Sequence, residues 1–461
     1  MRTFTTKRAS KILAISTIAA GMLSSASAFD IKYNGWLEMF GKGGFNNQAI
    51  DKDKGVYPTD SFLNVVGSIG FDGNLLPKTL ENQKLNYGFN FTGGSMILDS
   101  TSKSFPLGPD SVNNEYVGNW YGYDQTSGIS RGRRLFVVNN AYLDYTGDFN
   151  DGKFFFQFKG GRYLSGAEYM SGYTQGFEFT TKFKFSDSQS LKLWWFSSYG
   201  RAFAFGQWLI DFYSPQGYMT PGGQFANYGI HAFKAIYSLG GLDITPYIYF
   251  SPGTYTAPAF RVEYDTNKGF DGTGFRSRTF ANILLPIYGD RWDGEYRWGS
   301  IVNKYTQSLL IQQQFDYNNY NFGLGVYKNF GHANARIGTT GNPWMLDFWT
   351  ASSYDIGRSV SDMVGKDALT PYLFVGGTHF ANKLWWQLTG RWTDAERSQE
   401  HAIALNCKYQ IDERLSVGGK IEYFSDTTKA GYKVGESGAA VGTPKNVADR
   451  SHAFLWIHYD I

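Results

Sequence analysis

The sequence predicts an all-β protein, namely a transmembrane antiparallel β-barrel of about 16 to 18 strands with short periplasmic turns and long extracellular loops. Three observations lead to this prediction. The chain opens with an export signal, strand-length segments alternate apolar with polar residues, and the connections between those segments alternate in length.

The first 28 residues have the order of a signal peptide. A basic region comes first, the short and mostly apolar stretch Ile12–Met22 follows, and small residues end at Ala28. The apolar stretch is shorter than the roughly 20 residues that a spanning helix needs. We expect residues 1–28 to be cleaved and residues 29–461 to form the barrel in a Gram-negative outer membrane.

Composition agrees with a barrel that closes without disulfides. Aromatic residues make up 18% of the chain, and its one cysteine, Cys407, cannot form an internal bridge. Tyr and Trp in this abundance suit the aromatic girdles of membrane barrels. A large secreted β-protein rich in sugar-binding aromatics is the alternative with the same composition.

The charge of the chain points to no nucleic-acid partner. The 43 basic residues less the four in the predicted signal peptide leave 39, against 40 acidic residues, so the mature formal charge is −1. The basic pI of the whole chain therefore comes from the predicted signal peptide.

The clearest pattern lies in Lys153–Phe185, which reads as two strands around a Gly-, Ser- and Tyr-rich loop. In the second strand, phenylalanines such as Phe183 alternate with polar residues such as Lys182. Side chains in a strand alternate faces, so one face is apolar and the other polar. In a barrel the apolar face would contact lipid and the polar face would line the lumen, whereas in a soluble sandwich the apolar face would be the core.

The same alternation occurs along the mature chain and predicts sixteen strands, at Asp30–Lys42, Ser61–Asp72, Leu85–Thr92, Arg134–Tyr145, Lys153–Arg162, Gly176–Phe185, Leu191–Arg201, Gly229–Ser238, Asp243–Ser251, Lys304–Tyr317, Tyr320–Phe330, Thr370–Phe380, Lys383–Thr393, His401–Asp412, Leu415–Ser425 and Ser451–Ile461. Two more strands, at Phe260–Tyr264 and Thr279–Tyr288, would raise the count to eighteen.

Short and long connections alternate between these segments, as they do in bacterial outer-membrane barrels. The long ones, expected outside the cell, are Gly43–Asp60, Gly93–Arg133, Tyr163–Gln175, Ala202–Tyr228, Pro252–Asn303, Gly331–Leu369, Asp394–Glu400 and Asp426–Arg450. The last strand must pair with the first, because a free strand edge is not tolerated in lipid.

Several segments resemble a known family. They are YPTDSF at Tyr57–Phe62, GRYLSGAEYMSGYTQGFEF at Gly161–Phe179, LWWFSSYGRAFAFGQW at Leu193–Trp208, YFSPGTYTA at Tyr249–Ala257 and GFRSRT at Gly274–Thr279. The chain resembles the Hof-type outer-membrane proteins of Helicobacter and related bacteria, which implies an outer-membrane barrel and no catalytic or binding residues. It is more loosely similar to the OprD-type substrate-specific porins, which have eighteen strands, an inward-folded third loop and basic residues along the channel.

The predicted lumen face carries charged residues of both signs. The candidate pore-lining residues are Arg134, Lys182, Lys184, Lys192, Glu178, Arg391, Lys408 and Lys420, with Lys234, Asp144, Glu422 and Asp460 on the same faces. A ladder of cations would attract anionic solutes. The alternative is a merely hydrated wall, which the nearly neutral mature charge favours.

The third long connection, Tyr163–Gln175, is the candidate constriction, with Tyr163, Glu168, Tyr169 and Tyr173 as its candidate residues. Loops at this place fold inward in the porins that the chain resembles, and Glu168 would then face basic residues across the lumen. The alternative is an ordinary surface loop. Arg162 has the parity of the lipid-facing phenylalanines, so it needs a bulge or a place at the rim.

No catalytic pattern emerges. The chain has six His and no nucleophile elbow or phosphate loop, so we expect no enzyme, no cofactor and no metal. Cys407 falls on an apolar face and reads as an apolar residue. We expect a porin-like channel for passive diffusion of small hydrophilic solutes, embedded in outer-membrane lipid, as a monomer or a trimer. The alternative is a surface adhesin or receptor that acts through Gly93–Arg133 and Pro252–Asn303.

Overall fold

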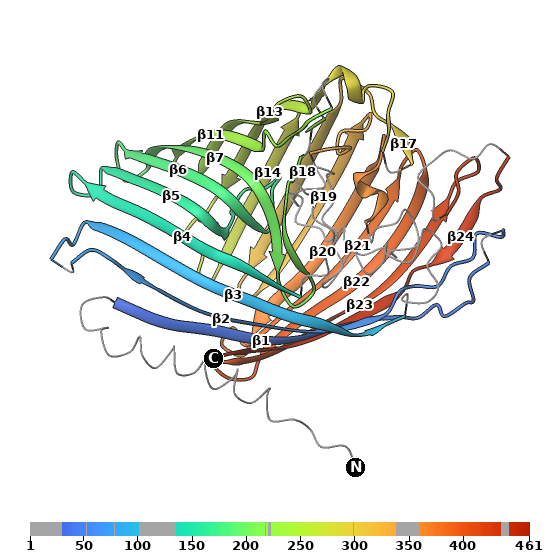
Figure 1. Cartoon of the computed structure of the whole chain (residues 1–461), viewed down its shortest axis with the longest axis horizontal. Coiled ribbons are helices and arrows are strands. Elements are labelled where there is room, and N and C mark those ends of the chain that lie inside the picture. The colour runs from blue at the N-terminus through green and yellow to red at the C-terminus, as the bar shows by residue number, and fades with distance from the viewer. Residues whose placement is uncertain are drawn as a thin grey trace, which may run out of the picture.

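In the computed structural model, strands wind antiparallel around a wide barrel (Figure 1). The structure describes residues 30–51, 53–77, 79–100, 135–216, 218–219, 223–297, 299–337, 360–434 and 442–461. The predicted signal peptide lies outside these residues and stays a prediction. Within them, eighteen strands pair in one closed ring.

The barrel strands are β1 (Asp30–Gly44), β2 (Phe62–Asn74), β3 (Gln83–Asp99), β4 (Phe136–Phe149), β5 (Phe154–Leu164), β6 (Tyr173–Lys184), β7 (Gln189–Ala204), β11 (Ile230–Leu239), β12 (Leu242–Ser251), β13 (Tyr255–Asp265), β14 (Phe275–Leu284), β18 (Gln307–Tyr317), β19 (Tyr320–Phe330), β20 (Leu369–His379), β21 (Leu384–Asp394), β22 (Ser398–Gln410), β23 (Leu415–Thr428) and β25 (His452–Asp460).

Shorter elements lie in the long connections: β8 (Leu209–Tyr213), β9 (Tyr218–Met219), β10 (Phe225–Ala226), β15 (Ile287–Tyr288), β16 (Tyr296–Arg297), β17 (Ser300–Ile301), β24 (Asn446–Asp449) and the 3₁₀ turns η2 (Asp290–Trp292) and η4 (Asp362–Val364). Within the part of the chain that the structure describes, no helix is both long and apolar enough to span a membrane.

The predicted closure is confirmed. β25 pairs antiparallel with β1 from Trp36 opposite Asp460 to Gly44 opposite His452. The amide of Ile461 donates to the carbonyl of Gly35, which extends the seam by one more bond. Both edges of the sheet are thereby paired, as a sheet surrounded by lipid requires.

The alternation of faces is confirmed as well. On β2, Asn64, Val66 and Ser68 are buried on the inward face, while Ile69 on the outward face is 62% exposed. On β1, Leu37 is 51% exposed outward. Exposed apolar residues on the outside and buried polar ones inside are the reverse of a soluble protein, and they suit a barrel in lipid.

The phenylalanines of β5 and β6 form one outward stack. Phe154 lies beside Phe183 with ring centroids 5.3 Å apart, and Phe156 lies beside Phe179 at 5.2 Å. Such cross-strand aromatic pairs on one face stabilise the register of the hairpin.

Three predicted boundaries were wrong. Pro252–Asn303 is not one loop, because β13 and β14 cross the wall inside it, and the larger strand count is the correct one. β3 continues to Asp99, so the loop predicted from Gly93 starts later. β5 ends at Leu164 and β6 begins at Tyr173, so the third connection consists only of residues 165–172.

Arg162 keeps its outward parity without a bulge in its own strand pairs. It lies opposite Ala141 of β4 and Gln175 of β6 in unbroken register. Its guanidinium donates to the side-chain oxygen of Gln175 at 2.9 Å and lies 4.4 Å from the ring centroid of Phe212. Of the two expected places, a bulge or the rim, Arg162 has the second: it lies near the end of β5, with a polar partner and an aromatic face.

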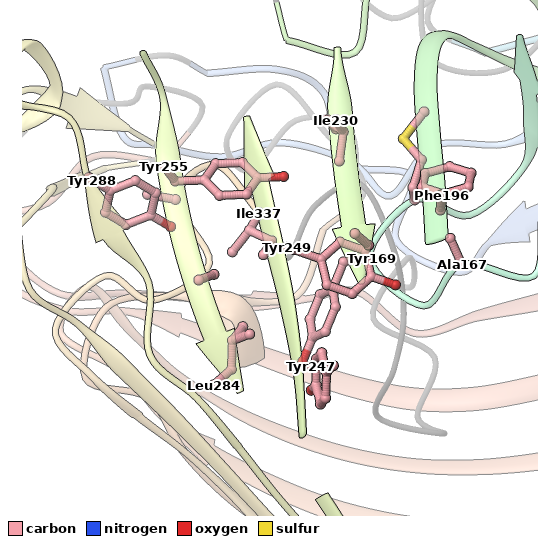
Figure 2. Packing of buried hydrophobic residues seen from close by; sticks show 14 of the residues in the cluster. Ala167, Tyr169, Phe196, Ile230, Tyr247, Tyr249, Tyr255, Leu284, Tyr288 and Ile337 are labelled. Carbon is pink, nitrogen blue, oxygen red and sulfur yellow. The ribbon is translucent and has the colours of Figure 1, made fainter. Parts of the chain in front are cut away.

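The largest buried cluster lies inside the barrel, where loops pack on the wall formed by β7 and β11–β14 (Figure 2). Tyr169 of the third connection and Ile337 of the β19–β20 connection are both fully buried there. The wall contributes Tyr249 and Phe196. The long connections therefore fill part of the lumen with apolar packing.

Candidate functional site: the channel lumen

The third long connection is clamped by one carboxylate to β11 and β13, which lie two and four strands along the wall from β6. Glu168 pairs with Lys234 of β11 at 2.9 Å and with Arg261 of β13 at 2.5 Å. Its amide donates to the hydroxyl of Tyr249 at 3.1 Å, and the neighbouring Tyr169 ring packs edge-on against Tyr249 at 5.2 Å. The connection thus crosses from β5–β6 to β11–β13 along the inner wall.

The clamp is charged at neutral pH. Burial alone would raise the pKa of Glu168, but Lys234 and Arg261 outweigh it and hold the pKa below its ordinary value. Lys234 also lies 4.9 Å from the ring centroid of Trp194, and Arg261 lies 5.1 Å from that of Phe280. Aromatic faces thereby complete the surroundings of both cations.

A second inward element is the hairpin made by the end of β7 and by β8. Its tip reaches β2, where Asn64 donates to the carbonyls of Gly206 at 3.3 Å and Gln207 at 2.8 Å. Figure 1 shows the end of β7 curving down toward β1 and β2. A Cβ at Gly206 would come within 1.8 Å of a carboxylate oxygen of Glu38, so the tip sits directly on β1.

The root of this hairpin is tied to the third connection. Arg201 donates to the carbonyl of Ser171 at 2.8 Å and to its hydroxyl at 3.1 Å. Apolar residues of β8 and β7, such as Leu209 and Ala202, pack with Val66 and Val137 on the inward faces of β2 and β4. The hairpin therefore bridges two sides of the lumen.

Beside the hairpin tip lies a cavity of about 460 Å³, lined by Trp36, Glu38, Phe40, Tyr173, Ala204, Phe205, Gly206, Gln207, Asn406, Lys420, Phe454, Trp456 and His458. We call it the seam cavity, because its wall is made by β1 and β25, where the barrel closes. Its lining combines aromatic rings with a few polar groups, as the linings of small-molecule sites do.

The β19–β20 connection forms a third inward element. His332 is fully buried and its ring donates from Nε2 to the carbonyl of Arg297 at 2.7 Å. Burial lowers the pKa of His332 to about 4, so the ring is neutral at pH 7. The hydroxyl of Tyr288 donates to the carbonyl of Ala333 at 2.7 Å, which ties this segment to β15.

The far end of the same connection is held by buried ions. Glu400 of β22 accepts from the Ser361 hydroxyl at 2.5 Å, from the Asp362 amide at 2.6 Å and from Arg391 at 2.6 Å. Asp362 in turn pairs with Arg397 at 2.8 Å. Arg391 was predicted to line the pore, and its contacts make it a structural partner of this loop.

The other predicted pore-lining residues have varied surroundings. Lys182 and Lys192 lie opposite each other on β6 and β7, and Lys184 pairs with Asp187 at 2.7 Å. Lys408 is exposed, and Lys420 is buried beside Glu422 at 2.8 Å. Arg134 lies outside the described residues.

Glu178 accepts from the Trp194 indole and from the Ser165 hydroxyl, both at 3.4 Å. Tyr163 lies on β5, where its ring centroid is 4.8 Å from the Lys159 ammonium. Tyr173 begins β6 and lines the seam cavity, so of the four residues predicted for the constriction only Glu168 and Tyr169 lie on the connection itself.

Sequence reasoning missed the most informative parts of the lumen. Arg261 lies in Phe260–Tyr264, which was given only as a possible extra strand, and it was not singled out as an inward residue. The inward hairpin at Phe205–Trp208 was taken as part of a loop. Glu38 of β1 and His458 of β25 were not among the predicted inward residues, and their 2.8 Å contact depends on closure of the barrel. Among the described residues, no three His, Cys, Asp or Glu side chains are grouped so as to hold a metal ion.

Comparison with known proteins agrees with this architecture. A family model described as "Putative outer membrane protein" matches residues 16–461. No curated protein matches the chain. The structural likenesses are at low sequence identity, so they concern the fold alone.

Three similar structures illustrate the fold. Acinetobacter baumannii OccAB4 has 9% identity and a TM-score of 0.58, with 94% of this chain and 99% of that one covered. Pseudomonas aeruginosa OpdK, determined with vanillate, has 9% identity and a TM-score of 0.53, with 94% and 98% covered. Pseudomonas aeruginosa OprD has 9% identity and a TM-score of 0.53, with 94% and 95% covered.

Proposed function

Because this chain belongs to the outer-membrane protein family whose model covers residues 16–461, and because its fold is that of the OprD and Occ barrels, we propose that it is a channel for passive diffusion of small hydrophilic solutes. The family and the fold are those of outer-membrane porin-like proteins rather than of enzymes.

The observation that carries the proposal is the polar and charged inner wall of a closed barrel. Lys182, Lys192 and Lys408 stand on inward faces, and polar residues such as Asn64 and Ser68 occupy the same faces of other strands. An eighteen-stranded barrel is wide enough to enclose water. Inward loops narrow such a lumen without removing its polar lining, which suits small solutes better than large ones.

A protein of similar fold agrees with a small solute. OpdK was determined with vanillate, a small organic molecule. The seam cavity, at about 460 Å³, has the size of a small-molecule site, which is commonly about 300–1,000 Å³.

The rival proposal, a surface adhesin, has less support. Of the two loops expected to serve it, Pro252–Asn303 is not one loop, because the wall strands β13 and β14 lie inside it. The other, Gly93–Arg133, lies mostly outside the described residues and has no bearing on the choice. We therefore keep the channel as the proposal.

Planar-bilayer recording of the purified protein tests it. We expect discrete conductance steps in potassium chloride, and none from protein unfolded by heat before reconstitution. A folded preparation that gives no steps at any voltage would overturn the proposal.

A further inference from the structure

Two groups of aromatic rings lie along the wall of the seam cavity. Trp36 stacks on the His458 ring at 5.7 Å, and Phe40 stacks on Trp456 at 6.0 Å with the planes 11° apart. Phe40 also lies 5.3 Å from Phe454. Both groups combine rings of β1 and β25, because these strands pair directly and their inward residues lie side by side.

One glycine lets the Trp456 ring lie close against the wall. A Cβ at Gly418 of β23 would come within 2.3 Å of the Trp456 indole. Only a residue without a side chain permits that approach, so the indole lies close against the backbone of β23 while it lines the cavity. A flat aromatic face is a platform for a flat or ring-shaped solute.

The charges around this platform are balanced. Lys420 pairs with Glu422 at 2.8 Å, and Glu38 pairs with His458 at 2.8 Å. Lys408 on the neighbouring β22 is close enough to Glu38 to interact electrostatically. An anionic solute would have to compete with carboxylates for each paired cation, and a cationic solute with Lys420 and Lys408.

Polar groups nevertheless surround the rings. Glu38, Asn406 and Gln207 line the same cavity and bring carboxylate and amide groups to its edge. Carboxylate oxygens accept hydrogen bonds, and amides both donate and accept them. A neutral solute with many hydroxyls can use all of these groups without disturbing the ion pairs.

From these observations we propose that the seam cavity binds neutral mono- and disaccharides on their way through the channel. The weakly polar C–H face of a pyranose ring stacks on Trp36 and Trp456, and its hydroxyls exchange hydrogen bonds with Glu38, Asn406 and Gln207. The proposal rests on the proposed channel function and specifies its solute class.

Two measurements test the site separately from the channel. The first is the interruption of ion current by glucose or sucrose added to a conducting bilayer, with benzoate as the anionic comparison. The second is saturation-transfer NMR of the same solutes with protein in detergent, which detects binding whether or not the protein conducts.

We expect glucose and sucrose to interrupt the current and to receive saturation, and benzoate to do neither at the same concentration. Trp36→Leu and Trp456→Leu should each weaken sugar binding by about 2- to 10-fold, the loss of one aromatic stacking contact. Trp386→Leu is the matched control, because Trp386 stacks with His379 on the outward face and should leave binding unchanged. Each variant must keep its ion conductance, which shows that the barrel has folded.

Normal conductance without sugar interruption or saturation would overturn the inference and leave the channel standing. Binding of benzoate in place of sugars would overturn it in favour of an anion site. A protein that never conducts would overturn the proposed function and, with it, passage of sugars through this cavity.

Discussion

The clamp at Glu168 gives the sharpest test of how the lumen is built. Glu168→Gln keeps the size of the side chain and its packing but removes its charge. Lys234 and Arg261, whose side chains are only 11% and 16% exposed, would then lose the carboxylate that both of them contact. Removing one partner from a buried ion pair costs about 3–5 kcal/mol.

Partial hydration lowers that cost here. Because the Glu168 side chain is 22% exposed, we expect about 2–3 kcal/mol, which corresponds to roughly a 30- to 150-fold rise in the undocked population of residues 165–172. Hydrogen exchange is the assay, since the amide of residue 168 is bonded to the Tyr249 hydroxyl in the docked loop. Its protection should fall by that factor.

The matched control is Asp187→Asn, which removes a carboxylate from an exposed pair with Lys184 and should leave this protection unchanged. Reversal potentials give a second readout, because the loss of one negative charge in the lumen should shift selectivity toward anions. Equal protection of residue 168 in wild type and Glu168→Gln would refute the clamp.

The pH dependence follows from the sign of the shift. The pKa of Glu168 is lower in the folded protein than in the unfolded chain. The clamp therefore stabilises docking fully above the unfolded pKa and loses its effect as the pH falls through the folded value. Protection corrected for intrinsic exchange should be constant from neutral pH down to about pH 5 and should fall only in stronger acid.

Three further predictions test the register and the inward elements. Gly206→Val should push the hairpin tip off Glu38 and change single-channel conductance, whereas Gly43→Val, where a Cβ meets nothing within 4 Å, should not. Burial lowers the pKa of His332 to about 4 in the folded protein, whereas an unfolded histidine titrates near 6.5, so the β19–β20 connection should lose stability as the pH falls from 6.5 to 4. In hydrogen exchange, His332→Gln should remove this pH dependence. Native Cys407 should resist a water-soluble thiol reagent while Lys408→Cys in a Cys407→Ser chain reacts; the opposite result would mean that β22 has the wrong register.

Much of the barrel wall was predictable because the alternation of apolar and polar residues can be recognised within a single strand. A period of two along β6 assigns Phe183 outward and Lys182 inward whatever the rest of the chain does. The failure at Pro252–Asn303 has a physical cause. The outer turn between β12 and β13 is only three residues long, so a search for long outer connections does not find it. In addition, the inward residues Arg261 on β13 and Arg278 on β14 are charged and resemble loop residues until their partners Glu168 and Glu263 are known.

The contents of the lumen were much less predictable, because they depend on contacts between distant segments. Nothing near Glu168 in the sequence indicates that Lys234 and Arg261 will meet it. The hairpin at Phe205–Trp208 carries apolar residues toward the inside of the barrel, where the alternation rule for strands predicts polar ones. A period-two argument assigns faces, but it does not say which loops fold inward.

The two sides of the seam cavity differ in rigidity, and we therefore expect variants on the two sides to have different effects. Trp36 and Trp456 stand on β1 and β25, which are held by a continuous ladder of strand pairing, so the binding wall is rigid. The facing tip of the β7–β8 hairpin contacts β2 through Asn64 and lies outside the ring of paired barrel strands, so it can move at lower cost than the wall. Substitutions in the wall should therefore change solute affinity at constant conductance, and substitutions in the tip should change conductance more than affinity. If wall variants and tip variants each changed solute affinity and conductance to the same extent, the wall would not be fixed while the tip moves. The cavity would then form only when the hairpin closes on its solute.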